Sequence, residues 1–174
     1  MQRAIGVLVF LLGLVLGSRI PDADQTIGLV HRSIITHILI IPFICFVAYI
    51  IGDIISRHFA IGMSIASAIH LSFDLFPQGW SGFALIYIPL LGRTSPTISW
   101  LFIAIGIILG AFIALVCIQD FAEGLLSFIS ALITFNLSAL DENYYFFPLL
   151  AFLVAIVIAL CLSPIARQRP QRYR

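Results

Sequence analysis

The sequence predicts an all-α protein: a polytopic transmembrane bundle of five or six membrane helices. Hydrophobic residues make up 61% of the 174 residues and charged residues only 10%, whereas soluble domains carry about 25% charged residues. The mean hydropathy is +1.14. The apolar residues also lie in long runs, as expected for helices that cross a ~30 Å hydrocarbon core. Without an internal repeat or linker, residues 1–174 form one expected integral membrane domain.

The first expected helix covers residues 4–17 and follows Arg3. At about 1.5 Å per residue this stretch measures only ~21 Å, so it approaches spanning length only if it extends to Ile20. Pro21 ends it, because a proline disfavours the helical conformation of the residue before it. A cleaved signal peptide, with Val15 and Gly17 as the small residues near its cleavage site, is the alternative.

Further helices are expected over residues 34–51, 59–76, 100–118, 121–140 and 146–162. Pro42 predicts a kink in the first of these, and Pro77 ends the second. The run 121–140 is the weakest, because it contains Glu123 and several hydroxyl and amide side chains. It either spans the membrane or lies in the interface.

The segment 77–99 contains too many glycines and prolines for a spanning helix. Its apolar part, residues 83–91, is expected to lie on the bilayer or to dip into it. The basic tail, residues 167–174, holds four arginines and is expected to be a solvated end near lipid headgroups. The pairs Gly13/Gly17 and Gly106/Gly110 have the four-residue spacing that allows close helix packing.

The charge balance excludes several classes of protein. Nine arginines, no lysine and eight acidic residues give a net charge of +1. This excludes an ordinary soluble enzyme, a disordered chain and a basic nucleic-acid-binding protein. Membrane lipids are the expected partners, and homo- or hetero-oligomers stay open. Cys45, Cys117 and Cys161 each lie alone in an apolar run, so we expect buried small hydrophobes rather than ligands.

Ionisable residues inside a membrane bundle are costly, so their grouping is informative. Six of the twelve acids and histidines fall into three clusters: Asp22 and Asp24, His31 and His37, and His70 and Asp74. The clusters follow the first helix, enter the second and lie near the end of the third. Because consecutive helices alternate in direction, all three clusters are expected at one membrane face.

The spacing within each cluster predicts which side chains point together. His70 and Asp74 are four residues apart and share a helix face. His31 and His37, six apart, do so only if His31 lies before the helix or in its first turn, which Gly28 allows. For the remaining pair, Asp22 and Asp24, an extended segment would point both carboxylates the same way.

Three imidazoles and three carboxylates at one face fit a divalent metal, with zinc expected first and manganese as the alternative. The expected metal ligands are Asp22, Asp24, His31, His37, His70 and Asp74. A second metal sharing a bridging aspartate is also open. A bound metal lowers the pKa of its water toward neutrality. The expected catalytic residues are Asp24, Asp74 and Arg32. An aspartate that is not a metal ligand serves as general base, and Arg32 holds a phosphate or pairs with a carboxylate.

Each of these residues also has a structural interpretation. The aspartates can shape a turn after Pro21, and the histidines can cap helices or bond to neighbouring ones. Asp53, His58, Asp120 and Glu123 lie at the opposite end of the bundle and are expected to be structural.

The order Pro-Asp-x-Asp, His-Arg-x-x-x-Thr-His and His-x-x-x-Asp resembles the bacterial membrane-bound metal-dependent hydrolases, the YdjM-like proteins. The matching residues are Pro21, Asp22, Asp24, His31, Arg32, Thr36, His37, His70 and Asp74, with Gly79 or Gly82, Tyr87 and Pro89 in the following loop. The resemblance covers about residues 15–90. The chain is a divergent member of this pattern: Gln25 replaces a frequent histidine, Val30 and Ser33 replace glycines, and Ile38 replaces a serine.

This resemblance implies a metal-dependent hydrolase in the bacterial plasma membrane. Because the site is expected at interface depth, near the apolar residues 83–91, the expected substrate is an amphipathic lipid or phosphoester at the membrane face. A non-catalytic structural or accessory subunit with a degenerate metal site is the first alternative. A metal or proton transporter is the second, and the nearly bare helix midpoints oppose it. If residues 121–140 span, the distribution of arginines places the site outside the cytoplasm. If they lie flat, it faces the cytoplasm.

Overall fold

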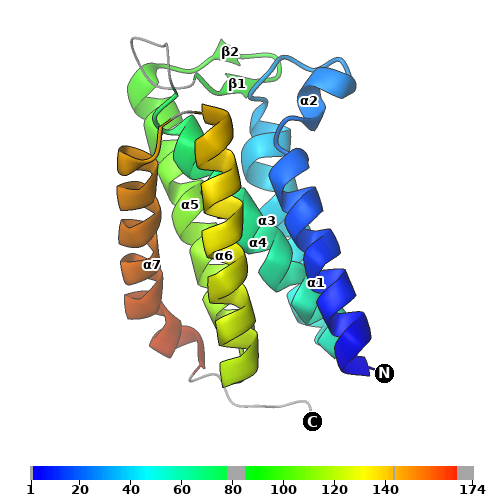
Figure 1. Ribbon diagram of the computed structural model, residues 1–174. Coiled ribbons are helices and arrows are strands. Elements are labelled where there is room, and N and C mark those ends of the chain that lie inside the picture. Colours follow the sequence, from blue (N-terminus) through cyan, green and yellow to red (C-terminus); the bar gives the residue numbers. More distant parts are fainter. Residues whose placement is uncertain (1, 78–84, 143, 168–174) are drawn as a thin grey trace.

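The computed structural model describes residues 2–77, 85–142 and 144–167 (Figure 1). The long helices are α1 (Gln2–Arg19), α3 (Ile40–Ile51), α4 (Ile54–Asp74), α5 (Pro96–Cys117), α6 (Phe121–Glu142) and α7 (Phe146–Arg167). A helical turn, α2 (Ala23–Thr26), and a π-helix, η1 (Ile35–Leu39), precede α3. A small antiparallel hairpin joins β1 (Tyr87–Ile88) to β2 (Gly92–Arg93), with Ile88 opposite Gly92.

The helical membrane class is supported, but five or six spans are not confirmed. Four helices, α4 to α7, are long and apolar enough to cross a membrane. Two further apolar helices, Ala4–Arg19 and Ile35–Ala48, are shorter. The run 121–140, whose state the sequence left open, belongs to α6 and is therefore one of the four candidates.

Several helix boundaries differ from the predicted ones for local reasons. Helix α4 begins at Ile54 because the Asp53 carboxylate accepts hydrogen bonds from the backbone N–H groups of Ile55 and Ser56, which caps the helix. Helix α5 likewise begins early, with Ser95 as its cap and a proline at its start. The predicted loop glycines 79 and 82, and the tail beyond residue 167, lie outside the described residues.

Helix α4 is the centre of the bundle, and α1, α3, α5, α6 and α7 all pack against it. Helix α1 approaches it closely because both helices present glycine at the crossing. A Cβ atom on Gly13 would lie 2.5 Å from the Phe59 carbonyl oxygen, and one on Gly17 would overlap the Met63 carbonyl. This backbone contact ties α1 into the bundle.

Helix α5 meets the other side of α4 in a similar way. A Cβ atom on Gly110 would lie 3.0 Å from the Ser64 carbonyl oxygen, and one on Gly106 would lie 2.8 Å from a methyl of Leu71. Both glycine pairs therefore serve helix packing, as predicted. Cys45 and Cys117 are buried as expected, whereas Cys161 is exposed because it lies on the outer face of the peripheral helix α7.

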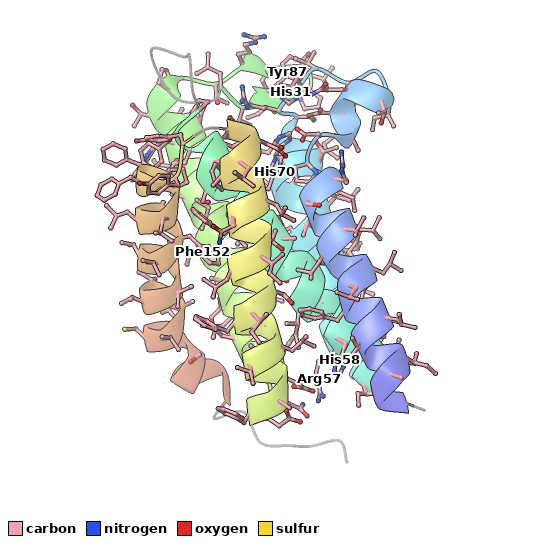
Figure 2. The ribbon with its side chains drawn as sticks, viewed as in Figure 1. His31, Arg57, His58, His70, Tyr87 and Phe152 are labelled. Atoms are coloured by element: carbon pink, nitrogen blue, oxygen red, sulfur yellow. The ribbon has the colours of Figure 1, made fainter. Side chains whose placement is uncertain are left out.

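The two ends of the bundle carry different polar groups (Figure 2). At one end, a buried ion pair joins Arg57 of α4 to Glu123 of α6. Beside it, His58 donates from Nδ1 to the Ile54 carbonyl oxygen, at 2.6 Å. Asp120 accepts a hydrogen bond from the Glu123 backbone N–H. These contacts match the structural roles expected there. The other end carries the predicted cluster of histidines and aspartates.

Candidate metal centre

A π-helical turn positions His37, the most buried of the predicted histidines. Pro42 lies one turn later in the same apolar run. Proline has no N–H to donate, and its ring crowds the carbonyl four residues earlier, here that of Ile38. A π-turn accommodates such a break, and single π-turns often occur at functional sites. The sequence predicted a kink at Pro42, and the structure has a π-helical turn just before it, which carries His37.

The loop before η1 has two residues in the left-handed backbone region, Gly28 (φ 75°) and Arg32 (φ 64°). For a non-glycine residue this conformation costs about 1–3 kcal/mol, so the surroundings must hold it in place. The Arg32 carbonyl oxygen accepts a hydrogen bond of 2.9 Å from the backbone N–H of Tyr87 in β1. The next residue, Ser33, forms a bridge with Tyr87. The hairpin therefore fixes the loop that carries His31 and Arg32.

Asp22 and Asp24 do not point the same way, because residues 23–26 form the helical turn α2 instead of an extended segment. The Asp22 side chain is 46% exposed and faces His70, with 3.8 Å between its Oδ1 and the His70 Nε2. The Asp24 side chain is fully buried and faces His37. The predicted shared direction is therefore wrong, because a helical turn separates residues two apart by about 200°.

Asp24 is held by donors from the following loop. Its Oδ2 accepts hydrogen bonds from the Ser33 backbone N–H (3.0 Å) and the Thr36 hydroxyl (3.2 Å). Its Oδ1 lies 3.3 Å from the His31 Nδ1. Burial opposes ionisation of Asp24, but the hydrogen bonds from Ser33 and His31 outweigh it, so the pKa of Asp24 lies below its ordinary value. Asp24 is therefore a buried anion whose oxygens are already engaged.

The two ring nitrogens of His37 face different carboxylates. Its Nδ1 lies 3.4 Å from the Asp24 Oδ2, and its Nε2 lies 3.4 Å from the Asp74 Oδ2. Within the described part of the chain, His37 Nε2 and Asp74 Oδ2 are both buried and have no hydrogen-bond partner. Two orphaned polar atoms that face each other are the arrangement expected around a cation-binding position.

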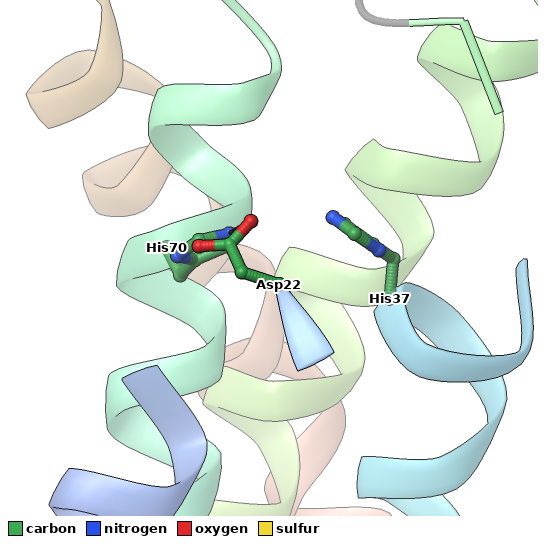
Figure 3. A group of neighbouring side chains, drawn as sticks. All are labelled: Asp22, His37 and His70. Atoms are coloured by element: carbon green, nitrogen blue, oxygen red, sulfur yellow. Dashed lines mark ion pairs between the residues drawn. The ribbon is translucent and has the colours of Figure 1, made fainter. Parts of the chain in front are cut away.

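Around this position lie further groups from other segments. The His70 Nε2 is 3.4 Å from the same Asp74 Oδ2, as expected for residues four apart on α4. Asp22 offers an oxygen from the turn after α1, and Figure 3 shows it beside His70, with His37 extending from another segment. Ligand atoms of Asp22, His37 and His70 all lie within 4.8 Å of one another. The other oxygen of Asp74 accepts a hydrogen bond of 3.2 Å from the Arg32 Nε.

Asp24, His31 and His37 form a second group with ligand atoms within 4.8 Å. The two groups share His37, whose Nδ1 faces Asp24 and whose Nε2 faces Asp74. The amide nitrogen of Gln25 lies 3.1 Å from the His31 Nδ1, so that nitrogen has two polar neighbours, Gln25 and Asp24. The group that contains His70 differs, because the His37 Nε2 has no hydrogen-bond partner within the described residues.

The structure thus brings all six predicted ligands and Arg32 to one end of the bundle, where the alternation of helices placed them. Sequence reasoning missed Ser33, Gln25 as a neighbour of His31, and the π-turn. No sequence signal marks Ser33, because it acts through its backbone N–H, which every residue except proline carries.

Comparison with models of protein families, with curated proteins and with solved structures found no match. The residues of the site therefore carry the functional argument.

Proposed function

We propose that this chain is a membrane-bound metalloenzyme. Its site, at the end formed by α2, η1 and the last turn of α4, takes one divalent metal, with zinc fitting the donors best. His37, His70, Asp22 and Asp74 are the proposed ligands. The proposed reaction is hydrolysis of an ester or phosphoester bond in an amphipathic lipid. The bacterial plasma membrane is the proposed location, in keeping with the family resemblance.

The observation that carries the proposal is the spacing of the donor atoms. Zinc binds nitrogen and oxygen at ~2.0–2.2 Å, and a tetrahedron with such bonds has edges of ~3.4 Å. The separations from Asp74 Oδ2 to the His37 Nε2 and to the His70 Nε2 are both 3.4 Å, and that from His70 to Asp22 is 3.8 Å. The 3.4 Å separations match the edges of such a tetrahedron, and neither the His37 Nε2 nor the Asp74 Oδ2 has a hydrogen-bond partner within the described residues.

The other residues orient these ligands. Asp24 faces the Nδ1 of His37, so a proton on Nδ1 leaves the lone pair of Nε2 directed at the site. This assigns Asp24 to positioning instead of general base catalysis, because its oxygens already accept hydrogen bonds from Ser33 and Thr36. Arg32 pairs with Asp74 and adds a positive charge beside the site, where an anionic substrate group is attracted.

A bound divalent ion would supply a Lewis acid and a water of lowered pKa. Asp22 is the most exposed of the three carboxylates, so substrate and water reach the ligands from its side. The same end carries exposed apolar side chains, namely Ile27 after α2 and Leu90 and Leu91 at the tip of the hairpin. An apolar border beside a cationic residue and carboxylates suits a substrate with an acyl chain and a polar headgroup.

The first test is the metal content of the protein purified in detergent, measured by mass spectrometry. We expect near-stoichiometric zinc or manganese, lost in the double variant His37→Ala/His70→Ala. The matched control is His58→Ala, which removes a histidine at the opposite end of the same helix α4 and leaves the metal content unchanged. Absence of metal from the wild type, even after reconstitution, overturns the proposal.

The second test is hydrolysis by metal-loaded protein in vesicles that contain glycerophospholipids and phosphatidic acid, with release of fatty acid, of the headgroup alcohol or its phosphate ester, and of inorganic phosphate followed separately. The product released identifies the bond that is cleaved. Metal retention without any hydrolysis favours the alternative of a structural or accessory subunit that keeps a metal site.

A further inference from the structure

The outer face of α6 carries a regular row of exposed residues. Their spacing alternates between three and four residues: Ala122, Leu125, Ile129, Leu132 and Asn136. Leu125, Ile129 and Leu132 are 46–49% exposed, and Ala122 and Asn136 are exposed as well. The buried residues of α6 that face inward, such as Glu123, Ser127 and Ser130, lie on the opposite side of the helix. This alternation is the a/d repeat of a two-helix seam.

Asn136 is the polar member of this row, on a helix long and apolar enough to cross a membrane. It is about five residues from the middle of α6, hence ~7 Å from the bilayer centre if the helix crosses symmetrically. Its Nδ2 donates a 2.7 Å hydrogen bond to the Leu132 carbonyl oxygen. The carbonyl oxygen Oδ1 of the Asn136 side chain has no donor within the described residues. An amide exposed to hydrocarbon without a full set of partners is costly, so a partner is expected there.

We propose that this face of α6 binds α6 of a second copy of the same chain. Two copies inserted in the same orientation and related by a two-fold axis along the membrane normal pack α6 parallel to α6. Residue 136 then meets residue 136 at the same depth. An amide carries both a donor and an acceptor, so two Asn136 side chains satisfy each other. A different partner would need its own polar group at that depth.

The rest of the row fits this arrangement. Leu125 and Leu132 occupy the d positions, and Ile129 occupies an a position, the pattern that favours two-stranded packing. A single asparagine at an a position fixes the register of such a pair. Because α6 meets α4 through its opposite face, the dimer leaves the candidate metal centre unchanged. The inference therefore stands independently of the proposed function.

Cysteine cross-linking in vesicles tests the geometry. Cys161 is replaced by alanine because it is exposed on α7, whereas the buried Cys45 and Cys117 stay. A Leu132→Cys variant places a thiol in the row. The matched control, Leu137→Cys, places one on the same helix at similar depth but off the row, at a position 59% exposed. We expect rapid disulfide dimerisation of Leu132→Cys and little of Leu137→Cys. Equal rates at both positions overturn the proposal.

Energy transfer between labelled copies in vesicles, measured over a range of protein-to-lipid ratios, tests the amide pair. Interhelical polar contacts in membranes contribute up to about 1–2 kcal/mol, so we expect Asn136→Val to weaken self-association about tenfold. Asn136→Gln keeps the amide and restores most of it. Because Asn136 is exposed, both variants should keep the monomer's thermal stability. An unchanged dissociation constant for Asn136→Val overturns the proposal.

Discussion

The close approach of α1 to α4 predicts that Gly13→Ala destabilises the bundle. The new Cβ atom would lie 2.5 Å from the Phe59 carbonyl oxygen and 3.0 Å from the Met63 backbone nitrogen, against an ordinary contact of at least 3.4 Å. The backbone cannot rotate away as a flexible side chain can, so the two helices must separate by about 0.9 Å at this point. Overpacking of this kind costs about 1–3 kcal/mol, partly offset by the better helix propensity of alanine. We expect a net loss of about 0–2 kcal/mol relative to the wild type, and of about 1–3 kcal/mol relative to a glycine-to-alanine change on an open helix face.

The assay is the free energy of unfolding of the metal-free protein, from reversible denaturant titration in mixed micelles. The matched control is Gly124→Ala on α6, where the new Cβ atom would meet only a methyl of Ile118 at 3.8 Å. This control should be neutral or slightly stabilising, because alanine is the better helix former by about 1 kcal/mol. A second measurement is zinc affinity. Asp22 follows α1 directly and lies 3.8 Å from His70 of α4, so a separation of the helices should weaken binding.

If Gly13→Ala unfolds with the same free energy as Gly124→Ala, the reasoning is refuted. Helix α1 would then not be held against α4 by backbone contact. Unchanged stability together with weaker zinc binding would also contradict it, because both effects are attributed to the same displacement.

Two further predictions concern the opposite end of the bundle. Arg57→Met should destabilise the protein by about 1.5–3 kcal/mol, because it removes a charged hydrogen bond to the buried Glu123 carboxylate and leaves His58, 3.7 Å away, as its basic neighbour. The double variant Arg57→Met/Glu123→Gln should recover most of this loss. A double-mutant cycle in unfolding free energy checks it, and no recovery would argue against the pair as the cause. The hydrogen bonds from the backbone N–H and the hydroxyl of Ser56 hold the pKa of Asp53 below its ordinary value of 3.8. The stability gained from the charge of Asp53 is therefore present above pH 3.8 and is lost as the pH falls through the lower pKa of the folded state. The variant Asp53→Asn keeps a side-chain oxygen that caps α4 but does not titrate. The stability advantage of the wild type over this variant should therefore fade in acid. A difference in unfolding free energy that stays constant from neutral pH to strong acid would contradict this role of Asp53.

Much of the fold follows from local sequence features. The apolar runs predicted the regions of all the long helices. A kink was predicted at Pro42, whereas the π-turn just before it was not predicted. The four-residue spacing of His70 and Asp74 placed them on one face, and their side chains do meet. Helix ends were predicted less well, because caps such as Asp53 and Ser95 act through single hydrogen bonds that hydrophobicity does not register.

For the candidate site too, the sequence predicted some features and not others. Alternation of helix direction was enough to bring the three clusters to one end, because it requires only that the chain turn back after each helix. It could not separate Asp22 from Asp24, since their directions depend on whether residues 23–26 form a turn or an extended segment. That choice depends on the donors of the following loop, Ser33 and Thr36, which reach Asp24 only once the chain has folded back.

The sequence by itself determined the class of the protein, the approximate position of each helix and the end of the bundle that carries the ionisable groups. These depend on composition and on spacing along one chain, which are local quantities. Tertiary structure alone decided that Asp24 is buried and accepts hydrogen bonds while Asp22 is half exposed. It likewise decided that the His37 Nε2 and the Asp74 Oδ2 face each other without a hydrogen-bond partner within the described residues. It also decided that Asn136 faces outward. Burial and pairing arise between segments far apart in the chain, and no local pattern encodes them.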